Sequence, residues 1–588
     1  MLTPMRSLRW FAATTLVALL GLSFVSGQAR AADPKASLSD KTIFLVEVKS
    51  VVGLREAFSQ TAFGQMIADP AMKAMKDSVS EKLAELDKKV KEEVGYTIAE
   101  LVDVPQGPVT LAVQAAEGKF PVAILATADA GKNADKMAAL MKKLNAAAEK
   151  SGKAKVSTKS FKSLTLNIIK GEKEDEPSLI WTNNGSVYHI SIATDSAALE
   201  DCISHADGRD DSLVKSENYA RLGKKLGETG QVSWFLDVSK LIKAGVNAAQ
   251  AAGGNQNPEA ILQLLGINGL KAVGGTLMLN AGKYDAMSKT VILAPAPAQG
   301  ILKMFSMPKK DLRPETWVPA TVSTYQTMSW DLDAAFTAMN DLLNMFQPGM
   351  INAFEQQLVG PAGGEPLSFQ KDIFGPLGNR ITMISDFKKP IKEDSQRILF
   401  AIALDDAKKF TNTVNKIIAL ANGSPKKREF QGATIYDFEL PEIPNNAPNN
   451  PFQGTVSLTV AKDYLMVATE PGLLEAVLRG GAATLAENAA FQAAVKDVPT
   501  QTSSLSFAGS EEQARASYDM IKSGQFEKAL EQAGAAGPDL SFLGKLFDKD
   551  KLPEFSVFAK YLSNAAGYAE MDDDGVTFTS FSVRKANP

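Results

Sequence analysis

A short strand–turn–helix unit occurs twice in this chain and limits its possible folds more than any other feature. The first copy runs from Tyr188 to Glu200, and the second runs from Tyr464 to Glu475. In both copies an apolar strand ends in Ala-Thr, and an acidic residue follows where a helix begins. A Thr or Asp there can cap free N–H groups, and Pro471 suits the first turn of a helix. The copies lie about 275 residues apart in a chain of 588, which predicts a duplicated domain.

Other segments recur in the same order in both halves, which supports the duplication. Strands joined mostly by hairpins predict an α+β class with two homologous repeats, each a mainly antiparallel sheet covered by helices. One face of each sheet should carry the helices, and the other should be solvated or paired with the sister domain. The matched segments are Thr42–Val48 with Val322–Met328, Val122–Ala128 with Arg397–Leu404, and Phe161–Leu164 with Phe430–Ala433.

Apolar periodicity predicts the main helices. A helix from about Val51 to Ile67 should stop near Asp69-Pro70, and a long amphipathic helix should follow from Met72 to Val94. Another should span Asn133 to Glu149. Residues Asn183-Asn184-Gly185 should form a tight hairpin turn, because Asn-Gly tolerates the positive φ angles that such turns need.

The first residues have the pattern of a secretory signal. Arg6 and Arg9 precede an uncharged apolar run from Trp10 to Val25, and Ala29-Arg30-Ala31 has the small-x-small form of a cleavage site. The alternative is an uncleaved anchor, although the run is short for a spanning helix. We therefore expect cleavage near Ala31 and a periplasmic or secreted mature chain with no transmembrane segment.

Four regions follow from these patterns. A signal peptide should occupy residues 1–31, a first repeat residues 32–294, a linker residues 295–314 and a second repeat residues 315–588. The linker is placed by four prolines between Ala294 and Pro314. Glu117-Gly118 and the polar stretch 253–258 should form turns within the first repeat.

Charge and cysteine content exclude some classes of function. The formal net charge of −4 becomes more negative when the arginine-bearing signal is removed, which argues against a nucleic-acid surface. The only cysteine, Cys202, excludes an internal disulfide framework. We expect Cys202 to be a small buried hydrophobe on its helix and not a reactive thiol.

No catalytic, metal-binding or cofactor-binding residue is predicted. His189 and His205 lack the additional ligands of a zinc site, and no phosphate-binding glycine loop or nucleophile elbow occurs. Glu570 to Gly575 partly resembles a calcium loop, but Phe581 stands where the twelfth-position glutamate belongs, which favours a hairpin turn. A carboxylate pair hidden from linear sequence stays open, because the chain has 67 acidic residues.

One apolar stretch in the second half suggests a surface for a partner or ligand. Methionine and phenylalanine adapt to varied apolar surfaces, so the stretch could line a groove for a partner helix or a lipid. The alternative is that these side chains cover the second sheet as part of its core. The predicted surface residues are Met339, Leu343, Phe346, Met350 and Phe354.

Two further segments carry a resemblance to a known group of proteins. They are Asp40–Val48 and Ala57–Gln65, which precede the Ala-Thr-acidic step described above. Together they resemble exported bacterial proteins known only by a domain of unknown function. The resemblance implies export and an α+β fold, and it brings no catalytic residues.

The leading hypothesis is a non-catalytic exported envelope protein that acts by binding or by structural interaction. Its partner would be an envelope protein or an apolar ligand, and its oligomeric state is left open. A periplasmic carrier of apolar ligands or lipids is the first alternative. A hydrolase with a carboxylate- or hydroxyl-based site is the second.

Overall fold

The chain forms two compact units in the computed structural model. The structure describes residues 34–94, 96–116, 121–150, 152, 154–171, 176–206, 208–251, 259, 262–263, 265–358, 365–389, 391, 395–420, 425–440, 454–527, 530 and 548–584. Unit 1 comprises the described residues up to 251 together with Leu270–Leu293, and unit 2 comprises those of 259–269 and from Ala294 onward. The predicted signal peptide and the predicted turns at Glu117-Gly118 and 253–258 lie outside the described residues.

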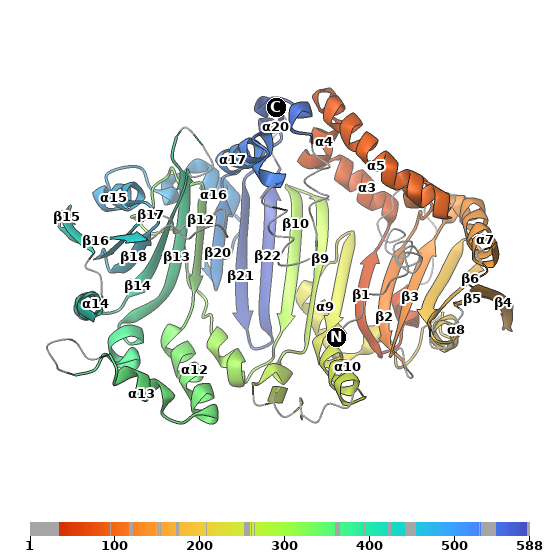
Figure 1. Ribbon diagram of the computed structural model, residues 1–588, viewed down its shortest axis with the longest axis horizontal. Coiled ribbons are helices and arrows are strands. Elements are labelled where there is room, and N and C mark those ends of the chain that lie inside the picture. The colour runs from red at the N-terminus through yellow and green to blue at the C-terminus, as the bar shows by residue number, and fades with distance from the viewer. Residues whose placement is uncertain are drawn as a thin grey trace. The chain divides into compact units, whose positions relative to one another are not determined.

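Unit 1 is built on one antiparallel sheet (Figure 1). Neighbouring strands pair in the order β10-β9-β8-β1-β2-β3-β7-β6-β5-β4. Their bounds are β1 (Thr42–Val48), β2 (Val109–Ala115), β3 (Val122–Asp129), β4 (Ala154–Phe161), β5 (Leu164–Gly171), β6 (Ser178–Asn184), β7 (Val187–Ala193), β8 (Val232–Asp237), β9 (Ala272–Ala281) and β10 (Tyr284–Leu293).

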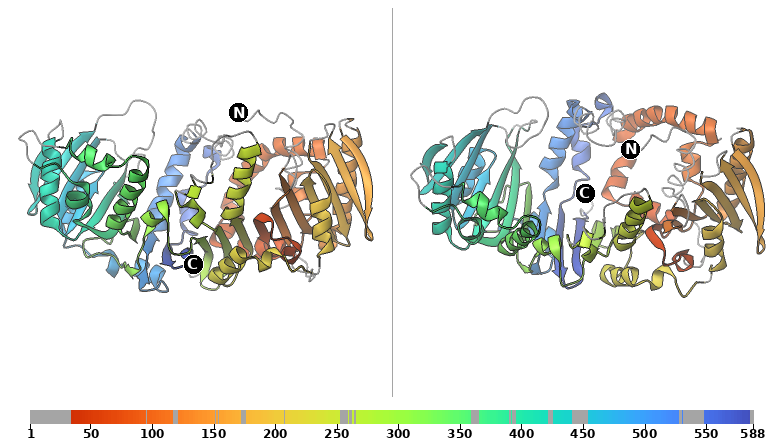
Figure 2. Two further views of the ribbon diagram at one scale, coloured as in Figure 1. Left: turned by 90° about the horizontal axis from the view of Figure 1, so that it is seen from below. Right: turned by 60° about the horizontal axis from the view of Figure 1, so that its bottom comes forward.

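Helices cover both faces of this sheet, which corrects the expectation of a single covered face. Leu179 of β6 packs with buried side chains of α7, whereas its neighbour Ile180 packs with those of α8 and α9. Figure 2 shows helices on both sides of this sheet. The physical reason is that the middle of β6 is apolar at successive positions, as a strand buried on both faces must be. The helices are α2 (Pro34–Ser37), α3 (Val51–Ser59), α4 (Ala62–Ala68), α5 (Lys73–Val94), α6 (Ile98–Val102), α7 (Ala134–Lys150), α8 (Ala197–Ser204), α9 (Glu217–Leu226) and α10 (Val238–Ala251), with short 3₁₀ turns η1 (Pro70–Met72), η2 (Gly131–Asn133) and η3 (Leu213–Lys215).

The strands of unit 2 also pair antiparallel. Neighbouring strands pair in the order β22-β21-β20-β12-β13-β14-β18-β17-β16-β15. The bounds are β12 (Thr324–Ser329), β13 (Leu377–Phe387), β14 (Gln396–Leu404), β15 (Lys426–Phe430), β16 (Ala433–Leu440), β17 (Gly454–Ala461), β18 (Tyr464–Ala468), β20 (Ser504–Ala508), β21 (Ala565–Asp572) and β22 (Gly575–Val583); a separate pair joins β11 (Lys310–Asp311) to β19 (Gln501–Thr502).

Helices also cover both faces of the unit 2 sheet. Phe410 and Val414 of α14 pack in one core cluster with Leu404. On the opposite face, the ring of Tyr325 in β12 packs against the ring of Phe491 in α16, with ring centroids 6.3 Å apart. The helices are η4 (Ile267–Gly269), η5 (Gly300–Phe305), α12 (Leu332–Phe346), α13 (Met350–Glu355), the π-helix η6 (Phe369–Phe374), α14 (Ala407–Leu420), α15 (Pro471–Arg479), η7 (Leu485–Glu487), α16 (Ala489–Val495), α17 (Ser510–Lys522), η8 (Lys549–Lys551) and α20 (Phe555–Ala559).

Most of the predicted elements form where the sequence places them, and the α+β class with antiparallel sheets is confirmed. The repeated unit appears as β7 with α8 and as β18 with α15. In the second copy, Glu470 caps α15 by accepting a hydrogen bond from the Leu473 amide at 3.1 Å, and Pro471 lies in its first turn. The long helix predicted from Met72 to Val94 is α5.

Two local predictions need correction, and one strand forms where none was expected. The helix predicted over 51–67 is divided into α3 and α4, because the Thr61 side chain caps a new helix by accepting from the Gly64 amide. The turn between β6 and β7 is Gly185-Ser186, and a positive φ occurs at Gly185 while Asn184 stays in the strand. Strand β4 was not predicted, because its exposed edge position leaves a run of Lys, Ser and Thr without apolar alternation.

Residues 295–314, predicted as a linker, fold with unit 2. The 3₁₀ turn η5 packs on α12, and the indole of Trp330 donates to the Met304 carbonyl at 2.7 Å. Residues 259–269, which the sequence places in the first repeat, also belong to unit 2, where the Ile301 amide donates to the Leu265 carbonyl.

Candidate functional site

The predicted partner surface lies on α12 and α13 of unit 2. Three of its five residues, Met339, Leu343 and Met350, are half-buried. Phe346 in the last turn of α12 is 62% exposed, and Phe354 in α13 is 52% exposed. The predicted set therefore divides between residues that pack against the fold and residues that face solvent.

The first half of α12 belongs to the core. Leu332, Ala335, Phe336 and Ala338 are buried. The ring of Phe336 stacks on that of Phe374 in η6, with ring centroids 4.4 Å apart. The alternative interpretation, that the stretch covers the second sheet, therefore describes the beginning of α12, whereas the exposed aromatic residues come later.

The exposed residues lie at the end of α12 and in the short helix α13 that follows it, and we call Met345, Phe346 and Phe354 the apolar tip. Met345 is 60% exposed and was not among the predicted residues. It neighbours Phe346 in sequence, so the dense Met and Phe content of the stretch was the signal that could have found it. The apolar tip holds three of the four most exposed large hydrophobic side chains in the described part of the chain.

Local contacts hold the apolar tip in place. Gly349 between the helices has a φ of +77°, a conformation that favours glycine. Its amide donates to the Asn344 side chain at 2.9 Å. The ring of Phe354 stacks on Phe369 with centroids 5.9 Å apart and planes inclined by 15°. The turn is therefore ordered by packing and hydrogen bonds, and its exposed side chains are presented on a defined backbone.

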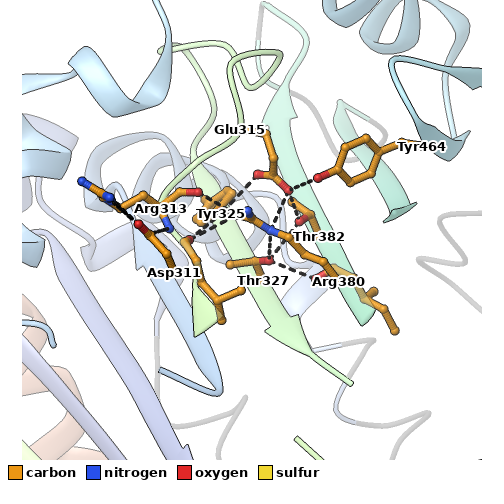
Figure 3. A network of polar contacts seen from close by, with 10 residues as sticks. Asp311, Arg313, Glu315, Tyr325, Thr327, Arg380, Thr382 and Tyr464 are labelled. Atoms are coloured by element: carbon orange, nitrogen blue, oxygen red, sulfur yellow. Dashed lines mark hydrogen bonds and ion pairs between the residues drawn. The ribbon is translucent and has the colours of Figure 1, made fainter. Parts of the chain in front are cut away.

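A second candidate is a buried polar network around Glu315 and Arg380 (Figure 3). The two side chains are 7% and 18% exposed, and Arg380 Nε lies 3.0 Å from Glu315 Oε1. The Thr382 hydroxyl donates to the same carboxylate oxygen at 2.6 Å, and the Tyr464 hydroxyl donates to it at 3.4 Å. Residues from the segment before β12 and from strands β13 and β18 thus meet at one carboxylate.

Burial also raises the pKa of both tyrosines in this network. It raises the pKa of Tyr325 well above the ordinary value of 10, and the nearby Glu315 charge adds to this effect. Burial and then Glu315 raise the pKa of Tyr464 to about 12. Both phenols therefore stay protonated at neutral pH and act as hydrogen-bonding groups, not as bases.

Arg380 connects this network to the backbone of the preceding segment. Its Nη2 atom donates to the Leu312 carbonyl at 3.2 Å and to the Arg313 carbonyl at 2.7 Å. The same nitrogen donates to the Tyr325 hydroxyl at 2.8 Å. These contacts clamp residues 312–315 onto the sheet, so the arrangement supports a structural role better than a chemical one.

The two histidines lie far from either candidate in sequence, and each has a local partner. His189 of β7 is half-buried, its Nδ1 lies 3.2 Å from the Thr127 hydroxyl, and burial lowers its pKa to about 4. His205 follows the end of α8, and its Nδ1 lies 2.8 Å from the Asp201 carbonyl. Neither contact assembles a catalytic pair of the kind that a general base requires.

The calcium-like motif is a hairpin turn. Residues 573–574 connect β21 to β22, and Asp572 accepts a hydrogen bond from the Asp574 amide at 3.0 Å. Within the described residues, no group of three His, Cys, Asp or Glu side chains could hold a metal ion. Cys202 is buried in the core of unit 1, as predicted, and burial raises its pKa.

Unit 2 also contains a pocket of about 450 Å³. Alanines of α16, including Ala490 and Ala494, form part of its wall, and Glu511, Glu512 and Arg584 bring charge to it. The Glu512 carboxylate already accepts from the Ser323 hydroxyl at 2.5 Å and pairs with Lys389 at 3.0 Å. The pocket is therefore of mixed polarity.

None of the helices in the described part of the chain is long and apolar enough to cross a membrane. No curated protein matches this sequence. One solved structure, titled "Structure of crystal form III of TP0453", aligns over 46% of this chain and 82% of its own, with 10% identity and a TM-score of 0.21. A comparison with protein families confirms the resemblance to a domain of unknown function: residues 349–532, within unit 2, match the family described as "Protein of unknown function (DUF3352)".

Proposed function

We propose that this chain is a non-catalytic exported envelope protein, periplasmic or secreted, that binds a partner through the apolar tip of unit 2. The observation that carries the proposal is the exposure of Met345, Phe346 and Phe354 on an ordered helical turn. Exposed apolar side chains that are gathered together are typical of interaction sites, whereas single ones are ordinary.

The buried acidic residues support a non-catalytic role. A hydrolase of the carboxylate type needs two nearby carboxylates whose environments leave them free for acid–base work. Like Glu315, the other buried acidic residues in the described part of the chain instead accept hydrogen bonds within the fold. Glu47 accepts from Lys35 and Ser233, Asp129 from Ser186 and the Gly131 amide, Asp237 from Asn218 and the Lys240 amide, Asp285 from the Ala62 amide, Asp386 from Arg397, and Asp437 from Arg428 and Ser457.

The same proposal includes an origin by duplication of one module. Strands β1 to β10 of unit 1 and strands β12 to β18 and β20 to β22 of unit 2 follow the same order in sequence and in their sheets. The hairpin turns predicted to match also correspond, with a positive φ at Lys162 in one and at Gln431 in the other. A shared non-local topology of this length supports common descent of the two repeats, 32–294 and 315–588.

Photo-crosslinking tests the proposed binding surface. A photoreactive benzoylphenylalanine replaces Phe346 in the full chain expressed with its own N-terminal segment, and Phe63, which is 56% exposed in unit 1, is the matched control position. We expect an adduct with an envelope protein or lipid at position 346 and none at position 63. Equal adducts, or none at either position, would overturn the proposal.

Cell fractionation tests the proposed export separately. The mature chain should appear outside the cytoplasm with Ala32 as its first residue. Recovery of a cytoplasmic chain that keeps residues 1–31 would contradict this part of the proposal.

A further inference from the structure

The apolar tip combines exposure with a lack of charge. Between Asp341 and Glu355 the sequence contains no Asp, Glu, Lys or Arg. The exposed side chains lie at the turn between two helices, and neither of the described pockets is lined by them. The apolar tip is therefore an uncharged, solvent-exposed surface of unit 2.

The area of the apolar tip is small for a protein partner. Phenylalanine and methionine side chains that are half to two-thirds exposed present roughly 300–400 Å² in total. A stable protein–protein interface buries about 800 Å² on each side, with matched shape and polar groups at its rim. A lipid surface needs no matched shape, and a few inserted aromatic or aliphatic side chains are sufficient for reversible binding.

The charges that flank the apolar tip indicate the kind of lipid. Asp341 and Glu355 bound this segment in the sequence, and both are acidic. Basic residues at such positions would favour anionic headgroups, and acidic ones disfavour them. The tip therefore suits a bilayer with zwitterionic headgroups.

We propose that the apolar tip inserts Met345 and Phe346 into the headgroup–acyl boundary of a zwitterionic lipid bilayer, with Phe354 following at its edge. This inference rests on the proposed function and specifies the partner of the same surface. The stacking of Phe354 on Phe369 and the Gly349–Asn344 hydrogen bond keep the exposed residues ordered, so insertion requires no rearrangement of unit 2.

Vesicle binding tests the inference with the mature full chain. The probes are phosphatidylcholine vesicles and vesicles that also contain phosphatidylglycerol. The test variant is Met345→Ser with Phe346→Ser, because both side chains are mostly exposed. The control is Phe63→Ser with Leu241→Ser, two exposed apolar positions of unit 1. Circular dichroism and the urea midpoint establish that each variant is folded.

We expect the test variant to lower the partition coefficient on phosphatidylcholine by about tenfold and the control to stay within about twofold of the wild type. Phosphatidylglycerol should weaken binding, and added salt should not weaken binding to phosphatidylcholine. Equal binding by the wild type and the test variant would overturn the inference.

A second readout locates the inserted residue directly. The fluorescence of the tryptophan in Phe346→Trp should be quenched by phosphatidylcholine that is brominated in its acyl chains, whereas the fluorescence of the tryptophan in Phe63→Trp should not be. Absence of quenching at position 346 would contradict insertion. If the wild type does not bind vesicles but position 346 crosslinks to an envelope protein, the lipid inference fails and the proposed function stands; if neither occurs, both fail.

Discussion

The carboxylate of Glu315 lies 3.0 Å from the guanidinium of Arg380, and both side chains are largely buried. Removal of one partner from such a pair leaves a buried charge without compensation. We expect Glu315→Gln to lower the free energy of unfolding by about 3 kcal/mol, measured by urea denaturation. Trp317, whose ring lies 5.3 Å from that of Tyr464, places a fluorescent probe beside the network.

The control for this prediction is Arg313→Gln. Arg313 pairs with Asp311, but the two side chains are 72% and 36% exposed. Exposed ion pairs contribute less than about 1 kcal/mol, so the loss should be correspondingly small. Equal losses for the two variants would show that burial does not determine the contribution of Glu315.

The lowered pKa of His189 leads us to expect a specific pH dependence of stability. Burial lowers its folded-state pKa to about 4, whereas the unfolded chain takes up the proton near the ordinary value of 6.5. Protonation therefore favours the unfolded chain as the pH falls from 6.5 to 4, and the loss is complete below that range. The expected loss from this residue is about 3 kcal/mol.

The variant His189→Gln keeps a polar group near Thr127 but does not titrate. Between pH 7 and pH 4, its free energy of unfolding should fall by about 3 kcal/mol less than that of the wild type. Urea denaturation at a series of pH values measures the difference. If the free energy of unfolding changes with pH in the same way for both proteins, His189 is not the source of the pH dependence.

Cys202 should be unreactive in the folded protein. Its side chain is buried, its Sγ lies 3.3 Å from the Ser37 hydroxyl, and burial raises its pKa. Because the thiolate is the reactive form, a disulfide reagent should modify it at least about a hundredfold more slowly in buffer than in denaturant. Complete modification within minutes in buffer would contradict the buried position.

Alanine substitution at two helical glycines of unit 1 should change the stability of the protein in opposite directions. A Cβ atom at Gly64 would lie 2.0 Å from the Phe58 carbonyl oxygen, so Gly64→Ala forces the backbone to move and should cost about 2–4 kcal/mol. A Cβ atom at Gly53 meets only ordinary contacts at 3.6 Å, and Gly53→Ala should stabilise by about 0.5–1 kcal/mol. The urea midpoints should therefore move in opposite directions, and shifts of the same sign would count against this packing.

The predictions that succeeded from sequence rest on local physics. Apolar periodicity identified α5, and capping residues identified the start of α15 at Pro471. The division between α3 and α4 has a local signal too, in the Thr61 cap, but the apolar pattern runs across it and masks that signal. Strand β4 was missed because an edge strand buries too little to require alternation.

The apolar tip was predicted in part. Composition alone drew attention to the stretch that contains Phe346 and Phe354, but it could not separate these residues from Met339 and Leu343, which are half-buried. That separation depends on where α12 leaves the sheet and turns into α13. The packing of the rest of unit 2 determines that point.

Local sequence patterns were sufficient to predict the class of fold, the alternation of strands and helices, and most of their starts and ends, because hydrogen bonding and hydrophobic periodicity act over a few residues. Long-range packing is what places helices on both faces of the strands in each unit, folds residues 295–314 with unit 2 and brings Glu315 to Arg380. Those outcomes depend on contacts between segments far apart in the chain, and such contacts leave no periodic trace in the sequence.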